Sequence, residues 1–172
     1  MAENVTSKQA RVLVIGTQHE LQRHQDTAED RKKVRVEFEG LLRRLIGERS
    51  ITLVAEEAGD DRAVWELLKR EEDSLGEYVE AFGGGRTVDA PVSTIAKNIA
   101  NGHSDQLRHA DIRVNADEMP LVEQRDEAMA AKIMEILGDA ESVLVVVGED
   151  HREGVVQRLR KQGLLVGSLR FP

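Results

Sequence analysis

Two histidines occur at the same spacing behind a glycine, and each follows a short apolar run. The first run, residues 11–15, continues into Gly-Thr-Gln-His at 16–19, and the second, residues 143–147, continues into Gly-Glu-Asp-His at 148–151. Histidine at such a position can serve as a general base, a proton shuttle or a metal ligand. The alternative for either residue alone is a loop histidine bonded to a nearby backbone group. The repeated spacing favours a functional role for both His19 and His151.

The apolar runs predict the sheet that positions these histidines. A short continuous apolar run is typical of a strand buried on both faces, as in a parallel sheet. Ligands of such sheets bind beyond the carboxyl ends of the strands. If the two strands are parallel, His19 and His151 reach the same edge although 132 positions separate them. We expect Gly16 and Gly148 to lie in turns where the backbone leaves the sheet sharply.

Two glutamates follow a third apolar segment, residues 51–55. Successive strand side chains face opposite ways, so only one of Glu56 and Glu57 can point into a given cleft. Alternatively, these acids only favour the start of a following helix. Carboxylates and two imidazoles at one edge could together hold a divalent metal such as Mn, Fe, Co or Zn.

Arg125 is the charged residue on the apolar stripe of a predicted helix, four positions from both Leu121 and Met129. An arginine in this position either meets a carboxylate or an anion, or packs its aliphatic stem while its head reaches solvent. In the first case it would pair with Glu57 or hold a developing oxyanion. We interpret Asp126 as an acid of the first helical turn and not as a catalyst.

Strands and helices alternate along the chain. The patterns predict strands over 11–16, 51–55, 109–114, 142–147 and 164–171, and helices over 27–46, 61–71, 92–100, 121–137 and 154–161. The pattern over residues 73–105 is the weakest, with a flexible break at 83–85. We therefore expect a single α/β domain over 1–172, with residues 1–10 disordered. The fold would be a three-layer sandwich with a mostly parallel sheet of about five strands and helices on both faces.

Composition excludes several classes of function. A net charge of −8 argues against a nucleic-acid partner, and the absence of cysteine excludes disulfides and thiolate chemistry. No segment approaches the roughly 20 apolar residues of a membrane span, and the polar N-terminus does not resemble a signal peptide. The expected protein is soluble and cytoplasmic. Its last predicted strand, if exposed at an edge, could pair in a homodimer.

Taken in order, these segments resemble a superfamily containing erythromycin esterase-like proteins, ChaN-like haem-binding lipoproteins and TraB/PrgY/Tiki proteins. The shared pattern is Gly-x-x-His at 16–19, a glutamate after the second strand, Arg125 followed by Met129, and Gly-x-x-His at 148–151, over roughly residues 11–160. In the esterase version the acid immediately precedes Ala-Gly. The resemblance therefore favours Glu57 over Glu56.

The leading functional expectation is a small hydrolase acting on a small-molecule or peptide substrate. His19 would activate water as general base, directly or through a divalent metal, with Glu57 orienting it. Arg125 and His151 would hold the substrate carbonyl or its oxyanion. The metal ligands would be His19, Glu57 and His151. Two alternatives are a non-catalytic module that binds a metal, a haem-like or an anionic ligand, and an interaction protein with a vestigial site.

Overall fold

A parallel five-stranded sheet forms the centre of the molecule. The computed structural model describes residues 11–18, 29–57, 94–103, 105–114, 118–138 and 140–172. The sheet order is β3-β2-β4-β1-β5, and every pairing is parallel, which confirms the predicted α/β fold. The strands are β1 (Val12–Thr17), β2 (Leu53–Glu56), β3 (Arg108–Asp111), β4 (Val143–Gly148) and β5 (Val166–Arg170).

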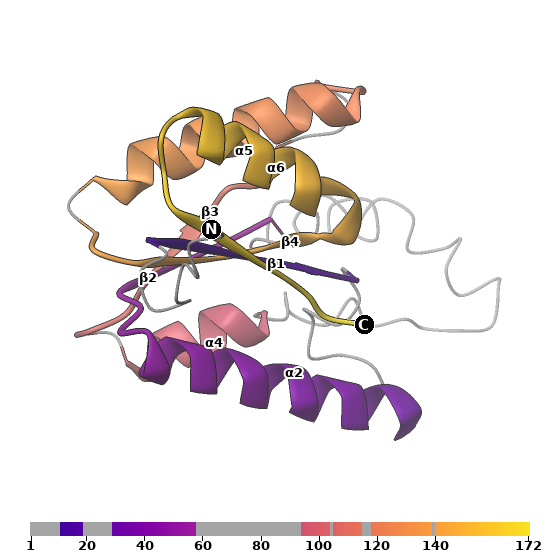
Figure 1. The fold of residues 1–172 in the computed structure, drawn as a ribbon. Coiled ribbons are helices and arrows are strands. Elements are labelled where there is room, and N and C mark those ends of the chain that lie inside the picture. Colours follow the sequence, from indigo (N-terminus) through magenta and orange to yellow (C-terminus); the bar gives the residue numbers. More distant parts are fainter. Residues whose placement is uncertain (1–10, 19–28, 58–93, 104, 115–117, 139) are drawn as a thin grey trace, which may run out of the picture.

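Helices cover both faces of the sheet, as Figure 1 shows. On one face lie α2 (Glu29–Glu48) and α4 (Ile95–Gly102), and on the other lie α5 (Val122–Leu137) and α6 (Glu149–Lys161). None of the helices in the described ranges is long and apolar enough to cross a membrane.

Strand alternation divides the core into two halves. Every residue of β1 and β4 is buried, and their side chains point alternately to the two faces. Val14 and Val145 pack with residues of α5 and α6, whereas Ile15 and Val146 pack with residues of α2 and α4. The main helical contributors to the core are Met129, Ile133, Val155 and Leu159 in the first half and Phe38, Leu42, Ile95 and Ile99 in the second.

The two strands that precede the histidines are direct neighbours. β1 pairs with β4 so that Thr17 lies opposite Gly148. The carboxyl ends of both strands therefore meet at one edge, as the sequence predicts. His19 itself, the predicted helix over 61–71 and the predicted break at 83–85 lie outside the described residues, as do residues 1–10.

Of the two expectations about the glycines, the one for Gly16 is wrong, whereas the backbone does leave the sheet at Gly148. Gly16 lies within β1, and Gly148 is the last residue of β4 and the N-cap of α6. A Cβ on Gly16 would lie 2.6 Å from Arg152 Cδ, so the absent side chain makes room for α6. Helix α6 begins directly at Glu149, not at 154, and acids in its first turn stabilise that start. His151 is consequently a helical residue and not a loop residue.

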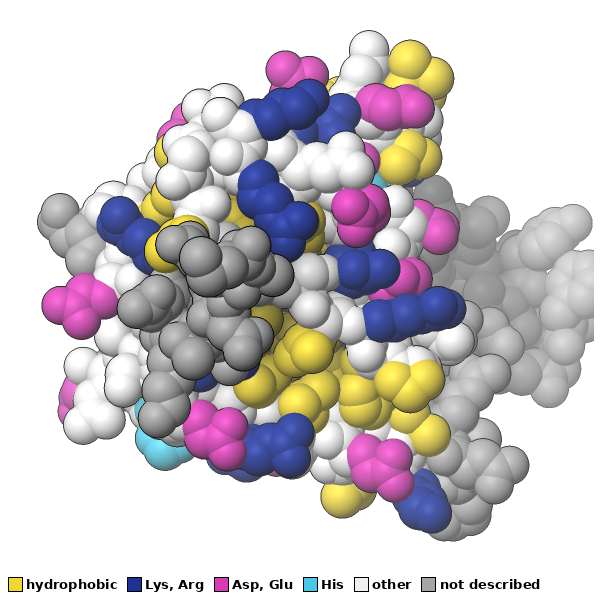
Figure 2. All heavy atoms as spheres, viewed as in Figure 1, with side chains coloured by type: hydrophobic (Ala, Val, Ile, Leu, Met, Phe, Trp, Pro, Cys, Tyr) yellow, Lys and Arg dark blue, Asp and Glu magenta, His cyan; other side chains and the backbone are white. Residues whose placement is uncertain are grey.

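One edge of the sheet carries exposed apolar side chains. Leu165, directly before β5, is 52% exposed, and Leu169, within β5, is 37% exposed. Figure 2, drawn from the same side as Figure 1, shows hydrophobic side chains gathered between β5 and α2.

Candidate functional site

Three side chains from separate parts of the chain meet at the carboxyl end of β2 and β4. They are Glu57, directly after β2, Asp126 in the first turns of α5, and His151 in the first turn of α6. Asp126 and His151 are both buried. The arrangement brings together two of the predicted site residues, Glu57 and His151, and adds one that the sequence analysis set aside.

The imidazole of His151 lies between two carboxylates. Its Nδ1 is 2.6 Å from Asp126 Oδ1, and its Nε2 is 3.4 Å from Glu57 Oε1. An ionised carboxylate only accepts hydrogen bonds. Nδ1 of His151 therefore carries a hydrogen and donates a hydrogen bond to Asp126 Oδ1. In the neutral ring Nε2 is then the basic nitrogen, and it faces Glu57.

Main-chain contacts fix Glu57 against β4. The backbone N–H of Glu57 donates to Val146 O at 2.9 Å, and Gly148 N–H donates to Glu57 Oε2 at 2.8 Å. Because Leu53 and Ala55 face α5 and α6, alternation turns Glu57 toward the same side. The position of this carboxylate is thus set by the β2–β4 pairing.

Asp126 is held where α5 and α6 pack closely. A side chain on Gly154 would overlap the Asp126 carboxylate, so the glycine allows it to approach α6. Arg158 Nη1 lies 3.8 Å from Asp126 Oδ2 and donates to Gly154 O at 3.1 Å. Arg158 Nη2 donates across to Glu123 O at 3.0 Å. Through these contacts Arg158 connects α6 to α5 beside the Asp126 carboxylate.

The structure places Arg125 differently from the expectation. Its Nη1 donates to the carbonyl oxygens of Met119 and Pro120, at 3.0 and 3.2 Å. Among the described residues these are its polar contacts, and Glu57 is not one of them. Its neighbour Asp126 supplies the buried charge, so our interpretation of Asp126 as a first-turn acid alone is wrong. Asp126, Met129 and Ile133 share one helical face. A carboxylate on that apolar face is the feature of the sequence that could have indicated a buried role for Asp126.

Glu56 belongs to a second polar cluster on the opposite face. It is fully buried, and its Oε1 accepts from Thr94 Oγ1 and lies 2.5 Å from His109 Nε2. Thr94 also caps α4 by accepting from Lys97 N–H at 3.1 Å. The sequence analysis found no such role for His109, because the contact requires β3 to lie beside β2.

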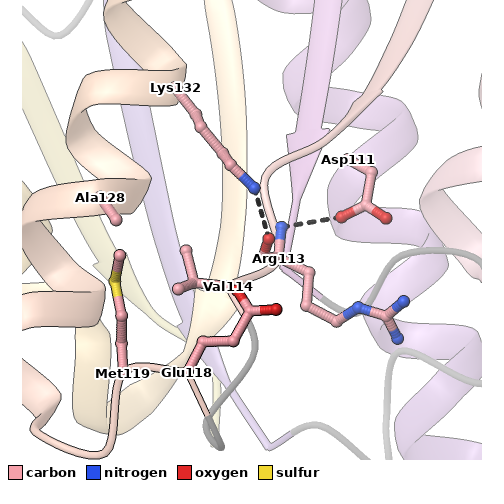
Figure 3. Close-up of a pocket in the computed structure, with 7 residues that line it drawn as sticks. All are labelled: Asp111, Arg113, Val114, Glu118, Met119, Ala128 and Lys132. Atoms are coloured by element: carbon pink, nitrogen blue, oxygen red, sulfur yellow. Dashed lines mark hydrogen bonds between the residues drawn. The ribbon is translucent and has the colours of Figure 1, made fainter.

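A cleft opens beside α5 at the end of β3 (Figure 3). Its volume of about 460 Å³ is in the range of small-molecule sites. Lys132 Nζ donates to Arg113 O at 2.6 Å, and Met119, whose carbonyl binds Arg125, forms part of the wall. Arg125 therefore positions one side of this cleft. The lining residues are Asp111, Arg113, Val114, Glu118, Met119, Ala128 and Lys132.

Comparisons with known proteins identify no relative of this chain. No family model matches the chain, and neither the curated proteins nor the solved structures contain a match. The resemblance to the esterase-like superfamily therefore stays a prediction.

Proposed function

We propose that this protein is a small hydrolase in which His151 transfers the proton of an attacking water. The observation that carries the proposal is one buried imidazole with a carboxylate at each nitrogen, Asp126 at 2.6 Å and Glu57 at 3.4 Å. A carboxylate on Nδ1 fixes the tautomer and ring orientation that a general-base histidine requires.

The chemistry follows from this arrangement. Nε2 of His151 accepts a proton from water while the water oxygen bonds to the carbonyl carbon of an ester or amide. The imidazolium that forms lies between Asp126 and Glu57, whose negative charges stabilise it. Collapse of the tetrahedral intermediate breaks the bond to the leaving group, and Nε2 returns its proton to that group.

The remaining residues take supporting roles in the proposal. His19 lies outside the described residues and follows β1 in the sequence, and we keep it in the proposal as a second imidazole. Arg125 shapes the cleft beside α5 through Met119, in place of the oxyanion role expected from the sequence. We assign a small-molecule or peptide substrate to that cleft, whose lining does not itself include Glu57, Asp126 or His151.

Divalent-metal binding is the second candidate function, and the Glu57–His151 spacing favours it. Ligand atoms about 2.0–2.2 Å from a tetrahedral ion lie about 3.3–3.5 Å from each other, and Glu57 Oε1 is 3.4 Å from His151 Nε2. Asp126 matches the carboxylate that commonly orients a metal-binding histidine. No group of three potential ligands occurs in the described ranges, and we expect His19 to complete the set. A bound Mn, Fe, Co or Zn ion would supply Lewis-acid chemistry.

Hydrolysis of p-nitrophenyl acetate, p-nitrophenyl butyrate and a fluorogenic peptide library tests the first candidate. We expect His151→Ala to lower kcat/KM by about 10²–10⁴-fold, because the general base is lost. Asp126→Asn keeps the size of the side chain but misorients the ring, and should cost about 10²-fold or more. His103→Ala, at the exposed end of α4, is the matched control and should retain the wild-type rate.

Two further measurements complete the experiment. His19→Ala should also abolish turnover while the circular dichroism spectrum stays unchanged. Elemental analysis separates the two candidates, since stoichiometric metal that disappears in His151→Ala supports the metal site. Full activity after dialysis against a chelator supports metal-free water activation. Undiminished turnover in a folded His151→Ala variant would contradict the proposed role of His151 as the general base.

A further inference from the structure

A surface groove lies between α5 and α6, which run side by side over one face of the sheet (Figure 1). Its volume of about 600 Å³ is within the range of small-molecule sites. The buried Ala130 and the partly buried Met134 give the groove an apolar floor. The other lining residues are Glu123, Glu127, Ala131, Gln157, Arg158, Lys161 and Gln162. A ligand in this groove would therefore meet apolar atoms below and polar side chains on both sides.

The two walls of the groove carry opposite charges. Helix α5 contributes Glu123 and Glu127, one turn apart, and α6 contributes Arg158 and Lys161, also one turn apart. Like charges at these spacings repel each other along a helix. In the part of the chain that the structure describes, no ion pair connects the acids to the bases across the groove. Each wall therefore favours a ligand group of the opposite charge.

We propose that this groove binds a small zwitterionic ligand, namely an apolar α-amino acid or a short peptide of such residues. Its carboxylate lies against Arg158 and Lys161, its ammonium group lies against Glu123 and Glu127, and its side chain covers the apolar floor. An anion alone would face the acids of α5, and a cation alone would face the bases of α6. The site is separate from the cleft at the end of β3 and does not rest on the proposed hydrolase activity.

Arg158 connects the groove to the buried pair of Asp126 and His151. Its Nη1 lies 3.8 Å from Asp126 Oδ2, and Asp126 Oδ1 lies 2.6 Å from His151 Nδ1. A carboxylate bound at Arg158 therefore changes the electric field beside Asp126. Occupation of the groove should consequently be detectable at the imidazole of His151.

Isothermal titration calorimetry with two families of probes tests the ligand class. L-leucine and L-leucyl-L-leucine carry both charges. Their N-acetyl derivatives lack the ammonium charge, and their amides lack the carboxylate. We expect the zwitterionic probes to bind saturably and each derivative to bind about tenfold more weakly, because one charged contact is lost. The tighter of the two zwitterions shows whether the ligand is a free amino acid or a peptide.

Two substitutions test whether the probes bind in the groove. Lys161→Met should reduce the preference for the zwitterion over its amide and leave the preference over the N-acetyl derivative unchanged. Glu127→Gln should have the converse effect. Arg160→Met and Glu135→Gln are the matched controls, because these residues lie on the same two helices but do not line the groove. Both control variants should bind the probes as the wild-type protein does.

The nuclear magnetic resonance signal of His151 Cε1 provides the second measurement. Saturation with the bound zwitterion should shift this signal, and an unshifted signal would contradict the connection through Arg158. The binding site itself would be refuted by three results. These are no saturable binding of either zwitterion, equal affinity for a zwitterion and its two derivatives, or wild-type preferences in both Lys161→Met and Glu127→Gln.

Discussion

Alanine at position 154 would place a methyl group inside the packed contact between α5 and α6. A Cβ built on Gly154 lies 2.6 Å from Asp126 Cγ and overlaps Oδ2, and it lies 3.3 Å from Arg158 Nη1. Non-bonded carbon atoms pack at about 3.5–4.0 Å. The Asp126 carboxylate must therefore move, and its hydrogen bond to His151 is lost.

Three effects determine the size of the change. Alanine stabilises a helix interior by about 1 kcal/mol relative to glycine. Overpacking costs about 1–3 kcal/mol, and losing a hydrogen bond to a charged group costs about 1.5–3 kcal/mol. We expect Gly154→Ala to lower the free energy of unfolding by about 1.5–5 kcal/mol.

Urea denaturation followed by circular dichroism measures this change. Gly40→Ala in α2 is the matched control, because a Cβ added at Gly40 would meet no neighbouring atom within 4 Å. That variant should gain stability from helix propensity alone. In an Asp126→Ala background the clash is gone, so adding Gly154→Ala should stabilise the protein. A Gly154→Ala variant as stable as the wild type would refute the packing described for Asp126.

Two other substitutions test the opposite half of the fold. His109→Ala removes a partner of the fully buried Glu56, and we expect a loss of about 3–5 kcal/mol in the free energy of unfolding by urea titration. A loss below about 1 kcal/mol would mean that the pair is not structural. Phe38→Ala creates a cavity in the core between α2 and the sheet. In the wild-type protein the ring centroid of Phe38 lies 5.0 Å from that of Phe171. It should cost about 3–5 kcal/mol in the same assay, and an unchanged midpoint would contradict that core assignment.

Local patterns were sufficient to predict most strands and helices. β1 and β4 lie within one residue of their predicted limits, because continuous apolar runs are typical of strands buried on both faces. Helix α5 follows its apolar spacing from 122 to 137 and ends at Gly138, whose φ of 28° suits glycine. The start of α6 was predicted too late because Gly148 was assigned to a turn.

The partners of the site residues could not be predicted in the same way. Asp126 reaches His151 only because α5 and α6 pack side by side, and no local pattern defines that contact. The alternation of Glu56 and Glu57 predicts opposite directions but not which helices each one meets. That choice depends on the sheet order, which places β2 between β3 and β4.

The position of β4 has a consequence for how this chain is made. β4 lies between β1 and β2 in space but follows both of them in the chain. During synthesis the two earlier strands emerge with no ladder to form between them, since each pairs with β4. Strand β2 can pair with β3 before β4 is made, but both partners of β1 come later, so β1 stays unpaired until β4 has left the ribosome. Chaperone binding during that interval would therefore concentrate on the first third of the molecule.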